Sequence, residues 1–361
     1  MTCINSVFTQ ELYKVEKKMA KLKDNEIPIF FATNDNYAPY LTVCIKSLLA
    51  NASKDYFYKL YVLTTNLDPK LEGRIKQSLT PNATIEFISL ANELDKIQDL
   101  FHLRDYYSKE TYYRFFIPDL FPDYDKVLYV DCDTILLGDI SELYNTDIRD
   151  YFLAGAQEEV MNTVDVFGTY VEEFLGIKRQ NYINAGVILI NTKRFLKFKI
   201  AEKFVELSKQ YKFRVTQDED YLNVLCKDRI KLVDLGWNKT AYKNPNFDDK
   251  NLKLIHYKIN WKPWHYANTL YEEYFWDYAK QTDFYEEILA QRDSYGDDLK
   301  KRDQEQYVKL VAMAEEDIAD PKGYWKTVAQ FEQQKAKGLV RINYLNLLRK
   351  LIGVKSRTNN E

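Results

Sequence analysis

Short apolar runs alternate with longer segments of mixed polarity between residues 27 and 257. The runs are rich in β-branched and aromatic residues, which is typical of strands, whereas apolar residues three and four positions apart in the intervening segments predict helices. The predicted strands span residues 27–33, 59–64, 84–90, 127–130, 152–156, 187–191, 230–233 and 252–256. The predicted helices span residues 40–50, 70–79, 192–211 and 218–226.

The alternation of strands with helices predicts an α/β fold, in which a mixed, mostly parallel sheet is flanked by helices. In such a sheet, ligands bind beyond the carboxyl ends of the strands. We therefore expect the chemistry of this protein to lie where the predicted strands end.

Both ends of the chain lack this alternation. Residues 1–26 are polar and charged, and we interpret them as an N-terminal leader to a catalytic domain that spans residues 27–275. Beyond that domain the strand signals stop. Helical spacing at residues 278–319 and 324–352 predicts a C-terminal helical appendix over residues 276–361.

Residues 335–357 form the basic end of this appendix. Basic residues recur there without an acidic one, and apolar residues recur at helical spacing. A basic amphipathic helix can lie on an anionic membrane surface as a peripheral contact. The alternative is a helix that packs on its own domain and exposes its basic edge to solvent, and the sequence leaves both interpretations open.

Charge and cysteine content exclude several classes of protein. Lys and Arg number 51 against 54 Asp and Glu, a formal net charge of −3, so no overall basic field indicates a nucleic-acid partner. The apolar runs are far shorter than the roughly 20 residues that cross a bilayer. The cysteines are scattered, without the spacing of a zinc or redox site. We expect a cytoplasmic protein, located at the inner face of the membrane if its basic end binds lipid.

The predicted strand at residues 127–130 runs directly into Asp131-Cys132-Asp133. In an extended backbone, residues two positions apart face the same way, so the carboxylates of Asp131 and Asp133 should converge while Cys132 points to the other side. Two hard oxygen ligands favour Mg²⁺ or Mn²⁺ and leave coordination positions free for phosphate oxygens. A D-x-D motif is common in an acidic chain and usually means a solvated loop, but the apolar run before this one favours a metal site.

The same motif has a second interpretation. Asp131-Cys132-Asp133-Thr134 after a strand resembles the nucleophile motif of haloacid-dehalogenase-type phosphatases, in which Asp131 would be the nucleophile. In those phosphatases the motif lies near the start of the fold, whereas several strand and helix units precede it here. The rest of the chain must therefore decide between the two interpretations.

Several other segments carry polar motifs. They are Phe31-Ala32-Thr33-Asn34-Asp35-Asn36-Tyr37, Thr111-Tyr112-Tyr113-Arg114, Asn184-Ala185-Gly186-Val187, Gln217-Asp218-Glu219-Asp220, and the segment that begins at His256 and contains Lys262-Pro263-Trp264. Together with the D-x-D motif, these segments resemble glycosyltransferase family 8, the retaining GT-A group that includes glycogenin and the bacterial lipopolysaccharide α-galactosyltransferases. The resemblance covers residues 27–265 and implies a GT-A (Rossmann-like) fold.

The resemblance implies how a sugar nucleotide would be bound. Ala32, Asn34 and Asn36 would line the uracil and the ribose. Arg114 would reach the diphosphate or the donor sugar, which suits the fixed fork of a guanidinium. Asn184 would bind the donor sugar, with small residues after it that let the backbone approach.

The resemblance also implies a metal site. His256 would be the third protein ligand beside Asp131 and Asp133, and an imidazole in that set favours Mn²⁺, with Mg²⁺ as the alternative. Lys262 would neutralise the leaving diphosphate. Where the family often has Gly, three residues after the His, this chain has Ile259.

Asp218 and Glu219 are the candidate catalytic residues. By resemblance, Asp218 would bind sugar hydroxyls, and Glu219 replaces the Gln that the family commonly has beneath the anomeric carbon. A Glu there can stabilise an oxocarbenium-like centre or attack it. The plainer interpretation is a helix N-terminus, where acidic residues are favoured by the helix dipole.

The function that the resemblance implies is transfer of a hexose, galactose or glucose, from a UDP-sugar to an oligosaccharide, glycolipid or glycoprotein acceptor. The new linkage would keep the α configuration, by attack on the leaving-group face or through a short-lived adduct on Glu219. The phosphatase and a non-catalytic protein that binds sugar nucleotides are the competing classes.

Overall fold

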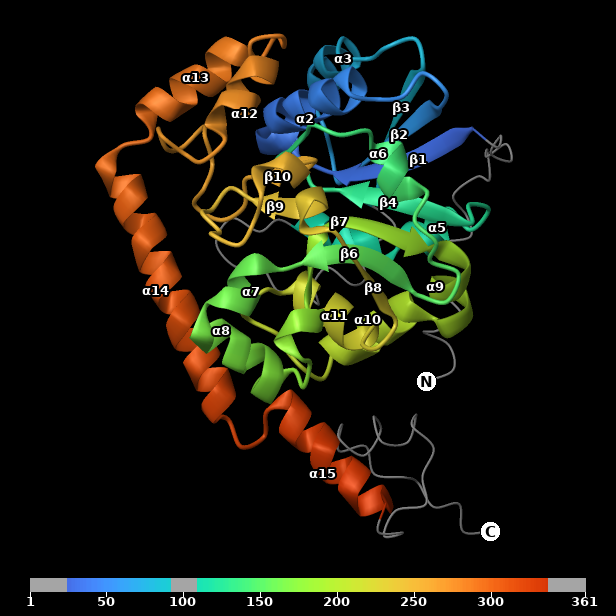
Figure 1. The fold of residues 1–361 in the computed structure, drawn as a ribbon, viewed down its shortest axis with the longest axis vertical. Helices are drawn as coiled ribbons and strands as arrows, with labels where there is room; N and C mark the ends of the chain where they lie inside the picture. The colour runs from blue at the N-terminus through green and yellow to red at the C-terminus, as the bar shows by residue number, and fades with distance from the viewer. Residues whose placement is uncertain (1–24, 92–108, 337–361) are drawn as a thin grey trace.

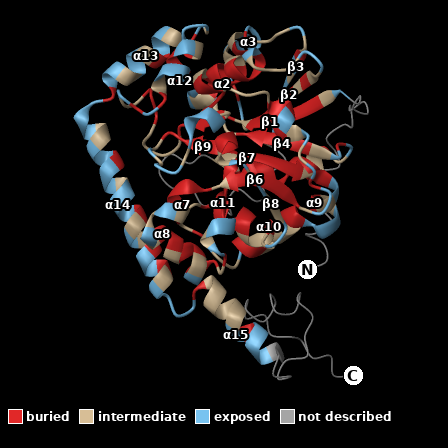
Figure 2. Ribbon diagram, viewed as in Figure 1, coloured by how far each residue is buried: buried red, intermediate tan, exposed pale blue. Residues whose placement is uncertain are grey.

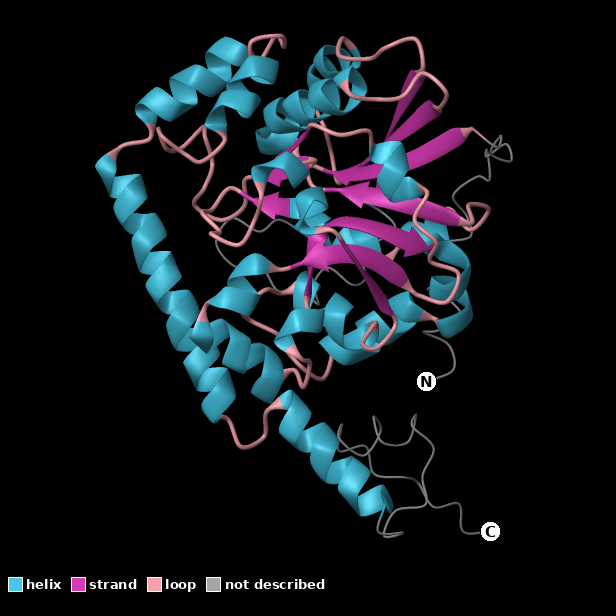
Figure 3. Cartoon of the chain, viewed as in Figure 1, coloured by secondary structure: helices cyan, strands magenta, loops and turns pink. Residues whose placement is uncertain are grey.

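The computed structural model of the chain describes residues 25–91 and 109–336, and the side chains up to residue 334. Its centre is a seven-stranded sheet in the spatial order β3-β2-β1-β4-β7-β6-β8, with helices on both faces (Figures 1 and 3). The strands are β1 (Glu26–Ala32), β2 (Phe57–Thr64), β3 (Ala83–Ser89), β4 (Lys126–Val130), β6 (Leu153–Gln157), β7 (Ile183–Asn191) and β8 (Ile230–Val233).

Strand β7 is the reversed strand of this sheet. β1 pairs in parallel with β2 and β4, β2 with β3, and β6 with β8, whereas β7 is antiparallel to both of its neighbours, β4 and β6. The start of β7 therefore lies at the edge where β4 ends, and the Asp131 N–H donates to the Gly186 carbonyl at 2.7 Å. The reversed direction of β7 therefore brings the Asn184-Ala185-Gly186 motif next to the Asp131-Cys132-Asp133 motif.

The five inner strands are largely buried on both faces, which explains why they read as continuous apolar runs, whereas the edge strands β3 and β8 are partly exposed. On β1, Phe30 belongs to the core on one face, while Ile29 and Phe31 belong to the core on the other (Figure 2). The first face is covered mainly by α9 (Thr192–Phe198), α10 (Ile200–Ser208) and α11 (Asp218–Leu225), and the second by α2 (Ala38–Ala50) and α3 (Pro69–Lys76).

A second, three-stranded sheet lies at the edge where β4 ends. It has the order β5 (Thr134–Leu136), β10 (Leu254–His256), β9 (Lys239–Thr240). β10 is antiparallel to β5, and His256 pairs with Thr134 in that register. The pairing places the end of β10 directly beside the Asp131-Cys132-Asp133 turn.

Shorter helices complete the catalytic part of the chain. They are η1 (Asp35–Tyr37), η3 (Lys109–Phe115), α5 (Ile117–Leu120), α6 (Ile140–Tyr144), α7 (Glu159–Thr163), α8 (Asp165–Thr169), η4 (Tyr170–Phe174), η5 (Arg179–Asn181), η6 (Leu235–Asn238) and η7 (Asp249–Asn251).

The C-terminal part is helical. It consists of α12 (Glu272–Ala279), α13 (Tyr285–Ser294), α14 (Asp297–Ala319) and α15 (Tyr324–Ala336). α12 packs against α2, and the long helix α14 runs down one side of the molecule and packs against α8 and η4 (Figure 1). No helix in the described part of the chain is long and apolar enough to cross a membrane.

The α/β class and the mostly parallel sheet with a helical C-terminal part are confirmed. Residues 1–24 of the leader predicted at 1–26 lie outside the described residues, and Glu26 at its end is already the first residue of β1. Most of the basic end predicted to contact a membrane, residues 335–357, also lies outside them.

Several predicted boundaries were wrong. The helix predicted at 192–211 is two helices, because Lys199 between them has a φ of 55°. The strand predicted at 187–191 begins earlier, at Ile183, so the Asn184-Ala185-Gly186 motif lies inside β7. The stretch predicted at 278–319 contains α13 and α14, with the end of α12 before them.

The extended conformation expected for Asp131-Cys132-Asp133 was also wrong. β4 ends at Val130, and the motif forms the turn between β4 and β5. The two carboxylates do converge, but the turn brings them together. Cys132 is buried, and its Sγ lies 3.1 Å from the Ala32 carbonyl.

Candidate active site

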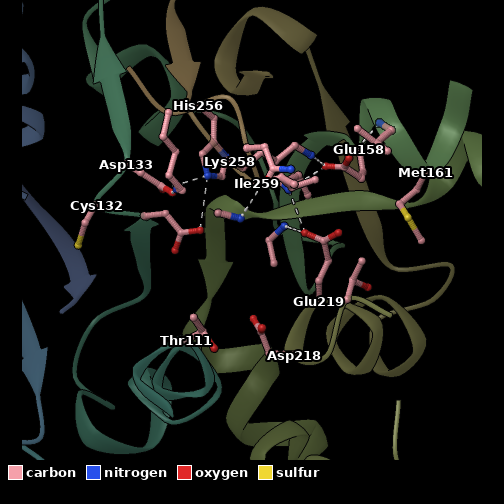
Figure 4. Close-up of a pocket in the computed structure, with 18 of the residues that line it drawn as sticks. Thr111, Cys132, Asp133, Glu158, Met161, Asp218, Glu219, His256, Lys258 and Ile259 are labelled. Atoms are coloured by element: carbon pink, nitrogen blue, oxygen red, sulfur yellow. Dashed lines mark hydrogen bonds and ion pairs between the residues drawn. The ribbon is translucent and has the colours of Figure 1, made fainter. Parts of the chain in front are cut away.

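One pocket in the described part of the chain collects almost all of the candidate residues. It opens at the edge of the sheet where β1 and β4 end and β7 begins (Figure 4). The predicted site residues among its lining are Ala32, Asn34, Arg114, Asp131, Asp133, Asn184, Asp218, Glu219, His256 and Lys262.

Only part of the predicted nucleotide-binding loop, residues 31–37, lines the pocket. Ala32 and Asn34 line the pocket, and so does Tyr37. Asn34 Oδ1 accepts the Tyr37 N–H at 3.3 Å and caps η1. Asn36, which the resemblance assigned to the nucleotide, is exposed and does not line the pocket.

Asp131, Asp133 and His256 form a candidate metal centre. One ligand atom from each lies within 4.8 Å of the others. His256 Nε2 is 3.1 Å from Asp133 Oδ1 and 3.8 Å from Asp131 Oδ2. Two carboxylates and an imidazole are a donor set that suits Mn²⁺ and, less well, Mg²⁺.

The hydrogen bonds of His256 test whether this set fits a cation. Asn238 Nδ2 donates to Asn184 Oδ1 at 2.8 Å, so Asn238 turns its Oδ1 towards His256 Nδ1, at 2.9 Å. Nδ1 must then carry the proton that it donates to this oxygen. Nε2 then faces the Asp133 carboxylate, and a ring nitrogen in contact with a carboxylate oxygen requires a cation or a proton between them. The residues therefore fit a divalent metal.

Gly186 leaves room for this centre. A Cβ on Gly186 would lie 2.4 Å from His256 Cε1, 2.5 Å from Asp131 Oδ2 and 3.0 Å from Asn184 Oδ1. Any side chain at this position would displace two of the three candidate ligands. The Gly of the Asn184-Ala185-Gly186 motif is thus explained by close packing against the metal site.

Lys262 pairs with Asp133. Its Nζ donates to Asp133 Oδ2 at 2.6 Å and to the Tyr257 carbonyl at 2.9 Å. Burial acts to raise the pKa of Asp133, but the charges of Lys262 and His256 outweigh it and hold that pKa well below its usual value. Burial acts to lower the pKa of Lys262, and the Asp133 charge outweighs it and raises that pKa. Both groups therefore stay charged and form a buried ion pair.

Arg114 connects two carboxylates from different elements. Its guanidinium donates to the Ala185 carbonyl and contacts Asp131 Oδ1 at 3.1 Å and Asp218 Oδ2 at 3.2 Å. Its Cζ also lies 4.3 Å from the centre of the Tyr129 ring. Arg114 therefore fixes Asp131 and Asp218 relative to each other, a role that the sequence did not indicate.

Glu219 belongs to a buried polar network (Figure 4). Its Oε2 accepts the Ala185 N–H at 2.8 Å and Asn184 Nδ2 at 3.0 Å. Asn184 Nδ2 also donates to Glu158 Oε2 at 2.8 Å, and Glu158 forms an ion pair with Lys258. Asn184 thus bridges two carboxylates that face each other across the pocket floor.

The carboxylates of the network differ in pKa. Burial and the neighbouring charge of Glu158 raise the pKa of Glu219 well above its usual value. Burial also acts to raise the pKa of Glu158, but Lys258 outweighs it and lowers that pKa. Burial raises the pKa of Asp218 to about 6, although Arg114 acts in the opposite direction. Negative charge therefore resides on Glu158, and Glu219 is the group that takes up a proton first.

Sequence reasoning missed Glu158 and Lys258. Glu158 follows closely after the strand predicted at 152–156, so the strand-end rule that selected Asp131 would also have selected it. Lys258 lies two residues after His256, and no local pattern indicates its partner. Their ion pair joins residues 100 positions apart, which only the fold brings together.

Comparison with known proteins agrees with this geometry. The model of Glycosyl transferase family 8 matches residues 28–268, more than half of the chain. General stress protein A of Bacillus subtilis (strain 168) is 28% identical over 281 residues, which cover 70% of this chain and 93% of that protein. The lipopolysaccharide 1,2-glucosyltransferase of Escherichia coli is 25% identical over 287 residues, 74% of this chain and 82% of that protein.

Two solved structures share the fold. The galactosyltransferase LgtC, in complex with donor and acceptor sugar analogues, has a TM-score of 0.58 and 26% identity and covers 71% of this chain and 96% of its own. The bifunctional WbbM glycosyltransferase has a TM-score of 0.67 and 25% identity, and this chain spans only 53% of it. With the family model matched over the segment that builds the pocket, the chain belongs to glycosyltransferase family 8 and is a glycosyltransferase.

Proposed function

We propose that the protein transfers galactose or glucose from a UDP-sugar to an oligosaccharide, glycolipid or glycoprotein, with Mn²⁺ as its cofactor and with retention of the α configuration. The observation that carries the proposal is the convergence of Asp131, Asp133 and His256 next to Lys262. The glucosyltransferase and galactosyltransferase among the similar proteins support a hexose donor.

The pocket supports a division of roles. A divalent cation held by Asp131, Asp133 and His256 would supply positive charge for the leaving diphosphate. Lys262 would bind the same diphosphate, because a nucleoside diphosphate needs charge stabilisation rather than a proton to depart. Asn184 and Asp218 would orient the sugar hydroxyls.

Attack on the leaving-group face is the route that we favour for retention. Glu219 Oε2 is already bound by the Ala185 N–H and Asn184. A nucleophile should be ionised, and burial near Glu158 instead favours the protonated form of Glu219 by raising its pKa. A neutral Glu219 resembles the Gln of the family in shape and in hydrogen bonding.

A panel of UDP-sugars tests the function directly. The full chain is incubated with Mn²⁺ and UDP-galactose, UDP-glucose or UDP-N-acetylglucosamine, and UDP release is followed. We expect release from a UDP-hexose that stops after exhaustive chelation and falls at least about 100-fold in Asp131→Asn and Asp133→Asn. Asp123→Asn, an exposed Asp outside the pocket, is the matched control.

The competing classes give different results when p-nitrophenyl phosphate is tested beside the UDP-sugars. Release of phosphate from p-nitrophenyl phosphate without UDP release would favour the phosphatase. Binding of UDP-sugars without turnover would favour a non-catalytic protein. Full turnover after chelation would refute the proposed metal centre.

A further inference from the structure

Helix α14 supplies one wall of the pocket, although it lies outside the segment that matches the family. Its lining residues are Asp303, Gln306, Tyr307 and Leu310. These positions are three, four and seven apart, so they form one stripe of the helix. The rest of α14 is largely exposed, as the helix runs along the side of the molecule (Figure 2).

The Tyr307 part of this wall lies beside apolar residues to which the proposed function gives no donor role. Tyr307 is 40% exposed, and its ring meets Phe167 of α8 at 6.2 Å and 79°. Val160 and Met161 of α7 also line the pocket. In Figure 4, Met161 lies on the opposite side of Glu219 from Cys132 and Asp133. The candidate metal centre and Met161 thus lie towards two ends of one pocket.

Among the pocket-lining residues of α14, two acceptor oxygens are buried without a hydrogen-bond partner. They are Asp303 Oδ1 and Gln306 Oε1. Asp303 is only 1% exposed, and its other oxygen accepts the hydroxyls of Tyr266 at 2.6 Å and Tyr295 at 2.8 Å. Buried acceptors without a donor cost free energy, and a ligand that brings O–H groups would satisfy both.

We propose that α14 and α8 form the acceptor site and that it takes a neutral pyranose. The sugar would place its apolar face on Tyr307 and Phe167, and its hydroxyls would donate to Asp303 Oδ1 and Gln306 Oε1. An anionic sugar is disfavoured, because both unpaired groups are hydrogen-bond acceptors and one is a carboxylate. This proposal rests on the proposed function, since it names the acceptor of the same reaction.

The test separates acceptor binding from donor chemistry. The rate of UDP-hexose hydrolysis without an acceptor measures donor binding and cleavage alone. Transfer is then measured to the p-nitrophenyl β-glycosides of glucose, galactose and N-acetylglucosamine, with the β-glucuronide as the anionic member. We expect glycosylated product from a neutral glycoside and at least ten-fold lower kcat/KM for the glucuronide.

Three substitutions probe the wall. Gln306→Leu removes one acceptor oxygen, and Tyr307→Ala removes the exposed ring. Asp303→Asn keeps an oxygen for the two tyrosine hydroxyls but turns an N–H towards the ligand. Each should lower kcat/KM for the acceptor at least ten-fold while donor hydrolysis stays within about two-fold. Gln304→Leu, the same substitution at an exposed position of the helix, should behave as the wild type.

Several results would overturn the assignment. One is an acceptor kcat/KM in the three variants that stays within two-fold of the value for Gln304→Leu. Another is a parallel loss of donor hydrolysis and transfer, because this would indicate a structural role for the substituted residues. The assignment is also wrong if the glucuronide is the best acceptor. It is wrong as well if the neutral glycosides are neither glycosylated nor bound, as measured by saturation-transfer NMR. A wild type that releases no UDP from any UDP-hexose would refute the proposed function itself, and the acceptor assignment with it.

Discussion

Gly186 shows how one missing side chain shapes the candidate metal centre. The space that its Cβ would fill is occupied by His256 and Asp131. Since neither residue is close to Gly186 in the sequence, the constraint arises only in the fold. The D-x-D turn, β7 and β10 must all approach one another for the three side chains to meet.

Gly186→Ala should therefore disable the site with little loss of folding. The new methyl group forces the imidazole and the Asp131 carboxylate apart, and misplacing catalytic groups by about 1 Å can cost on the order of 100-fold in rate. We expect UDP release to fall at least that far and the Mn²⁺ concentration for half-maximal activity to rise. Gly73→Ala is the control, because a Cβ there meets nothing within 4 Å. Unchanged activity and metal dependence in Gly186→Ala would contradict the packing argument.

Asp218 should reduce stability at neutral pH. Its pKa rises from 3.8 to about 6 on folding, so the folded protein binds this proton more tightly than the unfolded chain. The contribution of this group to the free energy of unfolding is greatest below pH 4 and falls as the pH rises to about 6.

Asp218→Asn removes that pH dependence. At pH 7 to 8 the variant should be more stable than the wild type by on the order of 2 kcal/mol, and it should lose transfer activity. Urea denaturation at pH 4, 5, 6 and 8 measures the difference. A difference that does not change with pH would show that the carboxyl is not perturbed.

The sequence predicted Asp131, Asp133 and His256 as a set because they lie in family motifs, but it could not predict how they are held. Asn238, which orients His256, lies in a short 3-10 helix with no motif. Arg114 was expected to face the donor, and its contacts to Asp131 and Asp218 depend on η3 packing beside α11. Such contacts are set by tertiary packing, and a residue's own neighbours in the chain carry no signal for them.

At the scale of elements, the loop after β10 keeps an unusual backbone. Ile259 has a φ of 55°, the left-handed region that favours Gly and penalises a β-branched residue. This is the position where the family often has Gly. The loop therefore holds Ile259 in a backbone conformation that suits Gly better than a β-branched side chain.

Ile259→Gly should stabilise the protein. Relief of the left-handed strain is worth roughly 1–2 kcal/mol and outweighs the greater entropy of Gly in the unfolded chain, so a net gain of about 1 kcal/mol is expected. Urea denaturation measures it, with Asn268→Gly as the comparison. Asn268 has a φ of 61°, but Asn tolerates this region, so its gain should be smaller. A loss of stability in Ile259→Gly would mean that side-chain packing outweighs the strain.

Element prediction succeeded for the strands of the large sheet and failed where elements were short. The five inner strands read as continuous apolar runs because both of their faces are largely covered. β5 and β9 were missed, since strands of 3 and 2 residues show no alternation. The break at Lys199 was missed because its neighbours keep helical spacing on both sides, and only the φ of one residue separates α9 from α10.

At the scale of the molecule, the candidate site is built from almost the whole described chain, from Ala32 in β1 to Leu310 in α14. A ligand that binds this pocket should therefore stabilise the entire fold. Saturating Mn²⁺ with UDP should raise the Tm by roughly 3–5 °C. Differential scanning fluorimetry measures the shift, which should vanish in Asp133→Asn and persist in Asp123→Asn. An equal shift in both variants would place the binding elsewhere.

The pairing of Lys262 with Asp133 has a consequence for the order of binding. Around the candidate metal centre, the carboxylates of Asp131, Asp133 and Asp218 lie beside Arg114 and Lys262. A divalent cation bound there would attract the diphosphate of the donor, and a bound diphosphate would in turn attract the cation. Each ligand therefore raises the affinity of the other by the same factor. Donor and cation should behave as one cooperative unit that enters and leaves together.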